Sequence, residues 1–222
     1  MKPQNFDLLL DSCDTLMLDM DGTLLDLAYD NYMWLEHIPT VYAQKNDLSE
    51  AAAKEKLYGI MKKVQGELIW YSLDHWSEVL DLDVASLHLD EQHRIGYLPG
   101  AKGFLEAVAA HDINVLMVTN SHQHTLDIKA AVTGITDYFD GIYTSHELGY
   151  AKEDQPFWHA LQDQVDFDCA KTVFIDDNAM VLQSARDYGV GNLLHITHPD
   201  TGRPAKQNDS FTGIAGVSDL VV

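Results

Sequence analysis

The sequence has few basic residues, few cysteines and no long hydrophobic run. It carries 14 Lys and Arg residues against 35 Asp and Glu residues, which gives a formal net charge of -21 over 222 residues. So acidic a surface repels phosphate backbones and anionic lipids, which excludes long nucleic acids and membranes as expected partners. A small phosphorylated substrate stays compatible if a local cation site overrides this field. No segment approaches the roughly 18 consecutive apolar residues of a membrane-spanning helix.

The two cysteines, Cys13 and Cys169, lie far apart and have no motif spacing. Such a pair predicts neither a disulfide framework nor a zinc site, and reduced thiols in the cytosol are the expected state. The segment 1–11 lacks the basic start and long apolar run of a signal peptide, and it contains two aspartates. We therefore expect a cytoplasmic protein, and its oligomeric state stays open.

What the sequence does contain is a pair of carboxylates at the end of an apolar run. The run Thr15–Leu18 predicts a buried strand, and Asp19, Asp21 and Gly22 follow it within the letters LDMDGTLLD. Side chains alternate along a strand, so both carboxylates point the same way, and the glycine lets the backbone turn sharply. Two like charges held close raise one pKa, which suits one nucleophile and one general acid or base. A strand followed by an ordinary Asp-Gly turn would give the same letters.

Alternating apolar runs and helical patterns predict a parallel α/β sheet with helices on both faces. The predicted strands, of which 141–144 is the weakest, cover residues 15–19, 113–119, 141–144, 172–176 and 192–196. The predicted helices begin after Gly100, cover 124–132 and 157–165, and run from the N-cap Asn178 to Tyr188.

The segment 29–95 breaks this alternation. Ser49 can cap a helix whose apolar residues recur at helical spacing, namely Leu57, Ile60, Met61, Val64 and Leu68. No comparable strand signal appears there, so we predict a helical insertion at 29–95 between the first strand and the next core helix. Residues 1–28 and 96–222 would form the α/β core, in which 198–210 is predicted to be a loop.

Further polar residues follow the other predicted strands. Thr119 and Asn120 close one run, and a hydroxyl with the amides of such a turn can hold phosphate oxygens. Lys152 lies in a loop after the weakest strand, and Asp176 and Asp177 end another. Alone, these residues read as a helix cap, a solvated lysine and an acidic pair at a helix N-terminus. Together they gather near the carboxyl ends of parallel strands, where open α/β sheets bind ligands.

This order of DxDGT, Thr-Asn, Lys and Asp-Asp resembles the haloacid dehalogenase superfamily of aspartate-nucleophile phosphatases. Longer stretches resemble its bacterial GMP/IMP nucleotidase branch: LDMDGTLLDLAYDNYMW from Leu18, WYSLDHWSEVL from Trp70, GYAKEDQPFWHAL from Gly149 and FIDDN from Phe174. The resemblance spans nearly the whole chain and implies a Rossmann-like, three-layer αβα core. The predicted insertion matches the superfamily's mobile helical cap in position. Glu153 is a departure, because a proline often follows the motif lysine.

The resemblance also implies roles for the motif residues. Asp19 would be the nucleophile that becomes an aspartyl-phosphate, and Asp21 the general acid and base. Thr119, with the backbone of Asn120, would hold the phosphoryl group, while Lys152 neutralises charge.

The implied cofactor is Mg2+, for which carboxylate oxygens are suitable hard ligands. Its implied ligands are Asp19, Asp176 and the Asp21 carbonyl, with Asp177 supporting them. Mg2+ and the motif lysine would let an acidic protein accept an anionic substrate.

Aromatic residues concentrate in the predicted insertion: Tyr29, Tyr32, Trp34, Trp70, Tyr71 and Trp76. Core packing is the simplest explanation for each, but a purine base needs flat apolar surfaces, so one or two are expected at the site. The histidines, without partners at metal spacing, are expected at the surface or as caps.

The resemblance therefore implies a Mg2+-dependent phosphomonoester hydrolase, specifically a purine 5'-mononucleotidase for GMP or IMP. A sugar-phosphate phosphatase or phosphomutase could use the same core. A halide-releasing enzyme is disfavoured because Asp21 supplies a general acid, which the dehalogenase members of the superfamily generally lack. A phosphate-binding interaction protein on the same fold is the non-enzymatic alternative, although no motif residue is lost.

Overall fold

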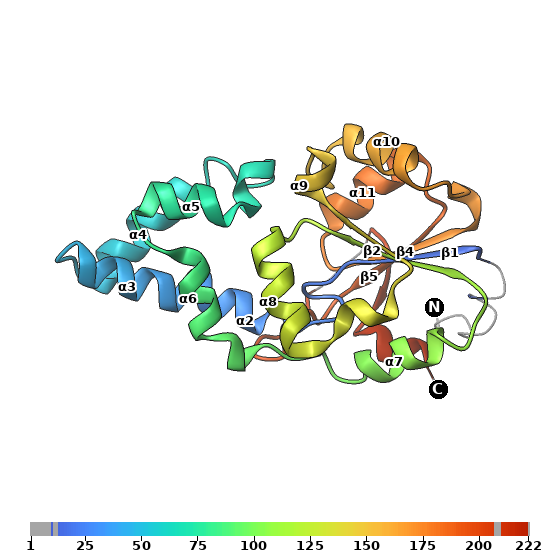
Figure 1. The fold of residues 1–222 in the computed structure, drawn as a ribbon, viewed down its shortest axis with the longest axis horizontal. Coiled ribbons are helices and arrows are strands. Elements are labelled where there is room, and N and C mark those ends of the chain that lie inside the picture. The colour runs from blue at the N-terminus through green and yellow to red at the C-terminus, as the bar shows by residue number, and fades with distance from the viewer. Residues whose placement is uncertain (1–9, 11–12, 207–209, 222) are drawn as a thin grey trace.

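A six-stranded parallel sheet forms the centre of the molecule (Figure 1). The computed structural model describes residues 10, 13–206 and 210–221. The strands stand in the order β3-β2-β1-β4-β5-β6, and every neighbouring pair is parallel. Their bounds are β1 (Thr15–Leu18), β2 (Asn114–Thr119), β3 (Gly141–Thr144), β4 (Thr172–Asp176), β5 (Asn192–Ile196) and β6 (Thr212–Ile214). The predicted parallel α/β sheet is confirmed.

Helices cover both faces of the sheet and also stand beside it. In Figure 1, α10 and α11 lie above the sheet and α7 lies below it. The bounds of the helices before the second strand are α2 (Ala28–Tyr32), α3 (Ile38–Lys45), α4 (Glu50–Met61), α5 (Leu73–Leu80), α6 (Val84–Asp90) and α7 (Ala101–Val108). Those after it are α8 (Gln123–Thr133), α9 (Ser145–Leu148), α10 (Gln155–Gln164) and α11 (Ala179–Tyr188).

The alternation of side chains along the strands produces the three layers. Leu16 and Leu18 of β1 belong to the apolar cluster that includes α7, whereas Met17 belongs to the cluster formed with α10 and α11. Because both faces are covered, β1 is buried at every position and apolar at all but Thr15, as parallel strands usually are. Trp158 of α10 packs edge-on against Phe174 of β4 with ring centroids 5.3 Å apart. Fully burying a large apolar side chain contributes about 1.5–3 kcal/mol.

The segment 29–95 contains helices and no strand, and the structure describes all of it. Its helices lie to one side of the sheet, nearest α8 (Figure 1). Met33, Leu57 and Trp76 from this segment are buried in the same apolar cluster as the α7 face of the sheet. The segment therefore packs against the sheet domain through apolar contacts.

Three helix ends follow the expected capping chemistry. The side chain of Asn178 accepts a hydrogen bond from the amide of Met180 at 3.0 Å and starts α11. Gly189 ends that helix with φ of +118°, which glycine adopts without a Cβ penalty. Ser49 caps α4 as predicted. The predicted strands differ from those observed by at most one residue at an end.

The predicted helix through Leu68 is wrong at its C-terminal end. α4 stops at Met61, and a 3-10 turn follows at Leu68–Tyr71. Gly66, with φ of +86°, lies between them in a left-handed conformation that a helix continuing to Leu68 could not contain. The last strand of the chain, β6, is absent from the predicted set, because its three residues carry only one buried side chain.

The expectation that histidines lie at the surface or as caps is wrong for two of them. His88 is 0% exposed and His195 is 4% exposed. Burial of a polar ring costs less where a ring nitrogen finds a hydrogen-bond partner, and His195 Nε2 lies 2.9 Å from the carbonyl of Asp177.

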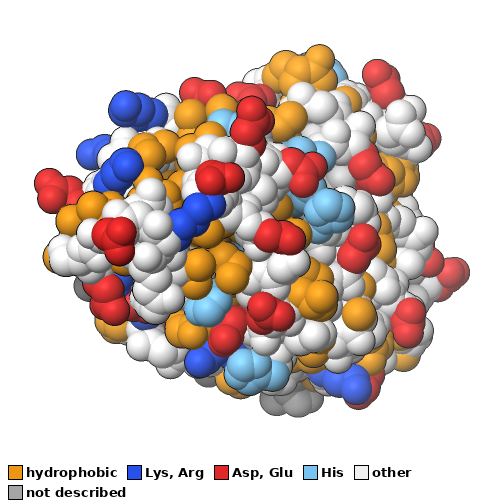
Figure 2. Space-filling model, turned by 60° about the vertical axis from the view of Figure 1, so that its left-hand side comes forward, with side chains coloured by type: hydrophobic (Ala, Val, Ile, Leu, Met, Phe, Trp, Pro, Cys, Tyr) orange, Lys and Arg blue, Asp and Glu red, His pale blue; other side chains and the backbone are white. Residues whose placement is uncertain are grey.

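Acidic side chains are spread over much of the face drawn in Figure 2, in keeping with the net charge of -21. Within the described ranges no helix is both long and apolar enough to span a membrane. Cys13, which is buried, and Cys169, which is partly buried, are free thiols in the structure. The expectation for the segment 1–11 falls, apart from residue 10, outside the described residues, and so do residues 207–209 of the predicted loop.

Candidate active site

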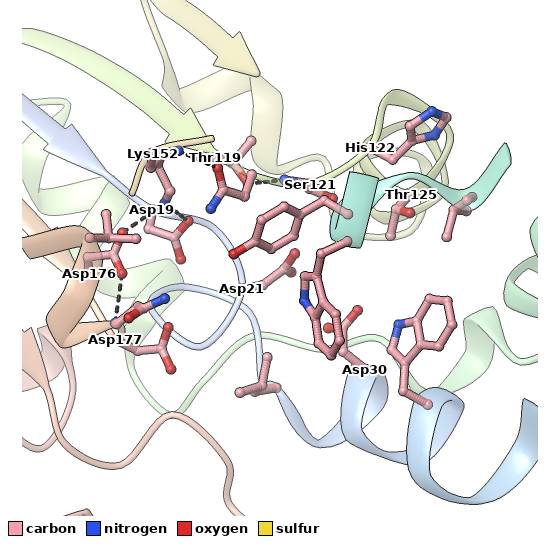
Figure 3. A pocket seen from close by; sticks show the side chains of 18 of the residues that line it. Asp19, Asp21, Asp30, Thr119, Ser121, His122, Thr125, Lys152, Asp176 and Asp177 are labelled. Atoms are coloured by element: carbon pink, nitrogen blue, oxygen red, sulfur yellow. Dashed lines mark hydrogen bonds and ion pairs between the residues drawn. The ribbon is translucent and has the colours of Figure 1, made fainter. Parts of the chain in front are cut away.

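The predicted site residues all line one cavity at the carboxyl ends of the central strands (Figure 3). They are Asp19, Asp21, Thr119, Asn120, Lys152, Asp176 and Asp177. Parallel pairing of β1 with both β2 and β4 brings these strand ends to the same edge of the sheet. The cavity measures about 310 Å³, at the lower end of the range usual for small-molecule sites.

A tight loop after β1 holds the first carboxylate pair. The amide of Gly22 donates to the carbonyl of Leu25 at 2.8 Å, and Leu25 donates to the carbonyl of Met20 at 2.9 Å. Gly22 has φ of +82°, and a Cβ at this position would lie 2.8 Å from Cγ of Asp177. The motif glycine is therefore needed both for the turn and for the close approach of the Asp177 side chain.

Lys152 is the central cation of the site, with 2% of its surface exposed. Its Nζ donates to Asp19 Oδ1 at 2.6 Å, to Asp176 Oδ2 at 2.7 Å and to the carbonyl of Val118 at 3.1 Å. Burial alone would lower the pKa of this ammonium group, but the charges of Asp176 and Asp19 outweigh burial and raise it. Lys152 therefore stays charged and bridges two strand-end carboxylates.

The buried carboxylates are difficult to ionise together. Burial raises the pKa of Asp19 to about 7 and that of Asp176 to about 6, although Lys152 opposes both shifts. Burial likewise raises the pKa of Asp21 to about 6, against the effect of Lys129. More positive charge at this centre would stabilise the ionised carboxylates.

The donor set fits a Mg2+ ion. Within the part of the chain that the structure describes, Asp19, Asp176 and Asp177 form the one acidic group whose ligand atoms all lie within 4.8 Å of one another. Hard carboxylate oxygens suit Mg2+, and a divalent cation would offset the excess negative charge that Lys152 leaves. Asp177 also pairs with Lys206 at 3.0 Å, on the outer side of the group.

Glu153, where the sequence departs from the superfamily pattern, connects three loops. Its carboxylate accepts hydrogen bonds from Tyr71 Oη at 2.7 Å, Asn120 Nδ2 at 2.9 Å and Asn178 Nδ2 at 3.2 Å. Asn120 Oδ1 in turn accepts from the backbone amide of Lys152 at 2.9 Å. The loop geometry around the motif lysine is thus fixed by side-chain hydrogen bonds in place of a proline.

Sequence reasoning missed a second buried cation, Lys129. It is 1% exposed, and its Nζ lies 2.7 Å from Asp21 Oδ1 and 2.8 Å and 2.9 Å from the two oxygens of Asp30. A signal was present, because Lys129 follows Leu126 and Thr125 by three and four residues and so shares their buried helix face. Its partner Asp30 gave no signal, since it comes from α2, far away in the sequence.

Three of the six aromatic residues of the insertion line the cavity, namely Trp34, Trp70 and Tyr71. Trp76 is buried beneath them, and its indole Nε1 donates to the carbonyl of Trp70 at 2.7 Å. Core packing and cavity-lining aromatics thus coexist, and three aromatics line the cavity where one or two were expected.

His88 also lines the cavity and has one polar atom without a partner. Tyr29 Oη donates to the carbonyl of His88 at 2.7 Å, so at the 3.1 Å contact with Nδ1 the imidazole is the donor. Burial lowers the pKa of His88 to about 3, so the ring is neutral. This tautomer, assigned from the hydrogen bonds, leaves Nε2 as a buried acceptor that meets no protein donor.

Comparisons with known proteins agree with this geometry. The family model of haloacid dehalogenase-like hydrolases matches residues 13–189. GMP/IMP nucleotidase YrfG of Escherichia coli (strain K12) is 39% identical over 194 residues, which cover 87% of each protein. Pyrimidine 5'-nucleotidase YjjG of the same strain is 25% identical over 181 residues, which cover 75% of this chain and 78% of that protein.

Solved structures support the fold. The crystal structure of a HAD phosphatase from Thermococcus onnurineus superposes with a TM-score of 0.77 at 19% identity and covers 93% of this chain and 95% of that one. The expected Rossmann-like αβα core and the resemblance to GMP/IMP nucleotidases are both confirmed. On the family match and the 39% identity, the chain belongs to the haloacid dehalogenase-like hydrolase family.

Proposed function

We propose that this hydrolase cleaves phosphoric monoesters through an aspartyl-phosphate on Asp19. The observation that carries the proposal is the pairing of Asp19 with Lys152 at 2.6 Å beside a second carboxylate, Asp21, in one cavity. One carboxylate can attack phosphorus while the other moves a proton. The GMP/IMP nucleotidase that is 39% identical supports a phosphate ester as substrate.

In the first step, an oxygen of Asp19 bonds to phosphorus as the bond from phosphorus to the ester oxygen breaks. The electron pair goes to that oxygen, which takes a proton from Asp21 and leaves as an alcohol. The Thr119 hydroxyl and the backbone amide of Asn120 hold the phosphoryl oxygens, while Lys152 offsets their charge.

In the second step, a water oxygen attacks phosphorus and Asp21 takes the proton. The bond between phosphorus and Asp19 breaks, which releases phosphate and restores the carboxylate. Asp19 and Asp176, with the Asp21 carbonyl and with Asp177 in support, would hold Mg2+, which supplies charge stabilisation to the transferring phosphoryl group when bound.

We assign the helical segment 29–95 as a cap over a core made of residues 1–28 and 96–222. Trp34, Trp70 and Tyr71 of this segment share the cavity with Asp19 of the core. A cap that contributes seven of the 20 residues lining the cavity can read the part of the substrate beyond the phosphate, and that binding energy can raise turnover as well as affinity.

A purine 5'-mononucleotide with a 6-oxo base, GMP or IMP, is the proposed substrate. The flat wall of indole and phenol rings suits a purine, and His88 Nε2 suits the N1–H donor that both bases carry. His88 is fully buried, and the centroid of the Trp34 ring lies 5.7 Å from that of the His88 ring. A base that binds in the cavity therefore displaces the Trp34 indole in order to reach His88 Nε2. AMP has no hydrogen on N1.

Two alternatives are separated by one assay. The test measures phosphate release with Mg2+ and with EDTA, and kcat/KM for GMP, IMP, AMP, UMP and glucose 6-phosphate. GMP and IMP are expected to be the best substrates. A sugar phosphate as the clear best substrate would favour a sugar-phosphate phosphatase or phosphomutase. No phosphate release from any ester would favour a phosphate-binding interaction protein.

A further inference from the structure

Two buried lysines divide the carboxylates of the site between them. Lys152 pairs with Asp19 and Asp176, whereas Lys129 pairs with Asp21 and Asp30. In Figure 3, Asp21 lies in the cavity between Asp19 and Asp30. The two carboxylates proposed for chemistry are therefore held by different cations from different elements, one in the loop after α9 and one in α8.

Lys129 does not form part of the surface that a substrate touches. It is 1% exposed, and it does not belong to the residues that line the cavity, although Asp21 and Asp30 both do. Its Nζ makes one hydrogen bond to Asp21, through Oδ1, and two to Asp30. A buried ammonium group with this geometry fixes the orientation of the Asp21 carboxylate without contacting the reacting atoms.

Asp30 shows why a cation is needed at this point. Its side chain and that of Asp21 both bind Lys129 Nζ, so without Lys129 two partly buried carboxylates would face each other around that point. Repulsion between like charges would turn Asp21 away from its present place. Asp30 comes from the α2 segment of the proposed cap, so Lys129 also joins that segment to α8.

We propose that Lys129 is a positioning residue, which holds Asp21 at the leaving oxygen of the ester. The inference rests on the proposed function, in which Asp21 protonates that oxygen. A ribose oxygen is a poor leaving group without a proton, whereas 4-nitrophenolate leaves as a stable anion. Misplacing Asp21 should therefore slow nucleotide cleavage much more than cleavage of 4-nitrophenyl phosphate.

The experiment measures kcat/KM for IMP and for 4-nitrophenyl phosphate in wild type, Lys129→Met, Asp21→Asn and Lys171→Met. This quantity reports formation of the aspartyl-phosphate and is independent of the later water attack. In Lys129→Met we expect a loss of roughly 10- to 100-fold with IMP, the usual scale for a misplaced group, and about 3-fold or less with the nitrophenyl ester. Lys171 pairs with Asp14 at the surface, so Lys171→Met is the matched control and should keep both values.

The outcomes distinguish a failure of the positioning role of Lys129 from a failure of the proposed role of Asp21. Equal losses on both esters in Lys129→Met would overturn the positioning role, since general damage to the fold lowers both. If Asp21→Asn shows no preference for the nitrophenyl ester, the proposed role of Asp21 fails. If only Lys129→Met lacks that preference, the inference about Lys129 alone fails.

Two further variants cover a folding defect in Lys129→Met. The double variant Lys129→Met with Asp30→Asn removes the repulsion between the carboxylates of Asp21 and Asp30, so it should fold. It should show the same preference for the nitrophenyl ester over IMP as Lys129→Met. Asp30→Asn alone keeps the bond from Lys129 to Asp21, so its ratio of the two kcat/KM values should stay within about 3-fold of wild type, well below the usual effect of a lost acid. A ratio in Asp30→Asn as low as that of Asp21→Asn would refute the inference.

Discussion

The clearest test of base recognition uses the wild-type protein and a change in the substrate. N1-methyl-IMP keeps the ribose, the phosphate and the 6-oxo group of IMP but has no hydrogen on N1. His88 lines the cavity, and its buried Nε2 is an acceptor without a protein partner. Once the Trp34 indole is displaced, the N1–H of IMP can donate to this atom, whereas N1-methyl-IMP cannot. We expect IMP to have the higher kcat/KM.

The magnitude follows from the burial of His88. Nε2 is already removed from water in the free protein, so a hydrogen bond from the base recovers a penalty of about 1–3 kcal/mol. That range corresponds to a ratio of roughly 5 to 150 in kcat/KM between IMP and N1-methyl-IMP. AMP should fall in the same range below IMP, because its N1 is an acceptor that would oppose the His88 acceptor.

The assay is phosphate release under kcat/KM conditions, with 4-nitrophenyl phosphate as an ester that has no base. His88→Phe keeps a ring but removes the acceptor, so it should lower IMP to the level of N1-methyl-IMP and leave the nitrophenyl ester unchanged. Since the methyl group also adds bulk, the decisive comparison is whether the difference between the two nucleotides disappears in His88→Phe. Equal kcat/KM for both nucleotides in the wild-type protein would refute the reasoning.

Three further predictions concern the catalytic centre. Asp19→Asn should abolish turnover with the fold intact, and Asp21→Asn should slow it by roughly 100- to 10,000-fold, the usual scale for a general acid or base; circular dichroism and phosphate release check both, and near-wild-type activity in either would contradict the covalent mechanism. Asp176→Ala should raise the Mg2+ concentration needed for half-maximal activity, with Ca2+ a poor substitute because its coordination is looser; full activity in excess EDTA would rule out the metal. Gly22→Ala should lower the melting temperature and activity together, because a Cβ would lie 2.8 Å from Asp177 Cγ; an unchanged melting curve would show that the loop relaxes freely.

The sheet could be predicted because each central strand is apolar on both faces. Leu16, Met17 and Leu18 are all fully buried, and a short, wholly apolar run of this kind is typical of a parallel strand that is covered on both faces. The motif carboxylates could be placed because parallel strands end at one edge. The short edge strand β6 could not, because only Ile214 of its residues is buried and the run is too brief to show a period.

The site could be predicted where its residues are neighbours in the sequence or follow the ends of predicted parallel strands. Asp19, Asp21 and Gly22 lie within four residues of one another, so their relation shows in the letters. The pairing of Lys129 with Asp30 joins helices 99 residues apart and depends on how the insertion packs against α8. Likewise, the tautomer of a histidine depends on hydrogen bonds that no sequence pattern specifies.

The three hydrogen bonds to Glu153 differ in what they join. The bond from Tyr71 connects the insertion to the core, whereas the bonds from Asn120 and Asn178 connect two loops of the core. Swinging the insertion away from the sheet must break the first bond but can leave the other two in place. A hydrogen bond to a charged group is worth roughly 1.5–3 kcal/mol, so this single bond favours the closed arrangement by a factor of about 10 to 150. Movement of the insertion relative to the sheet would therefore leave the two core loops that carry Asn120 and Asn178 joined to each other through Glu153.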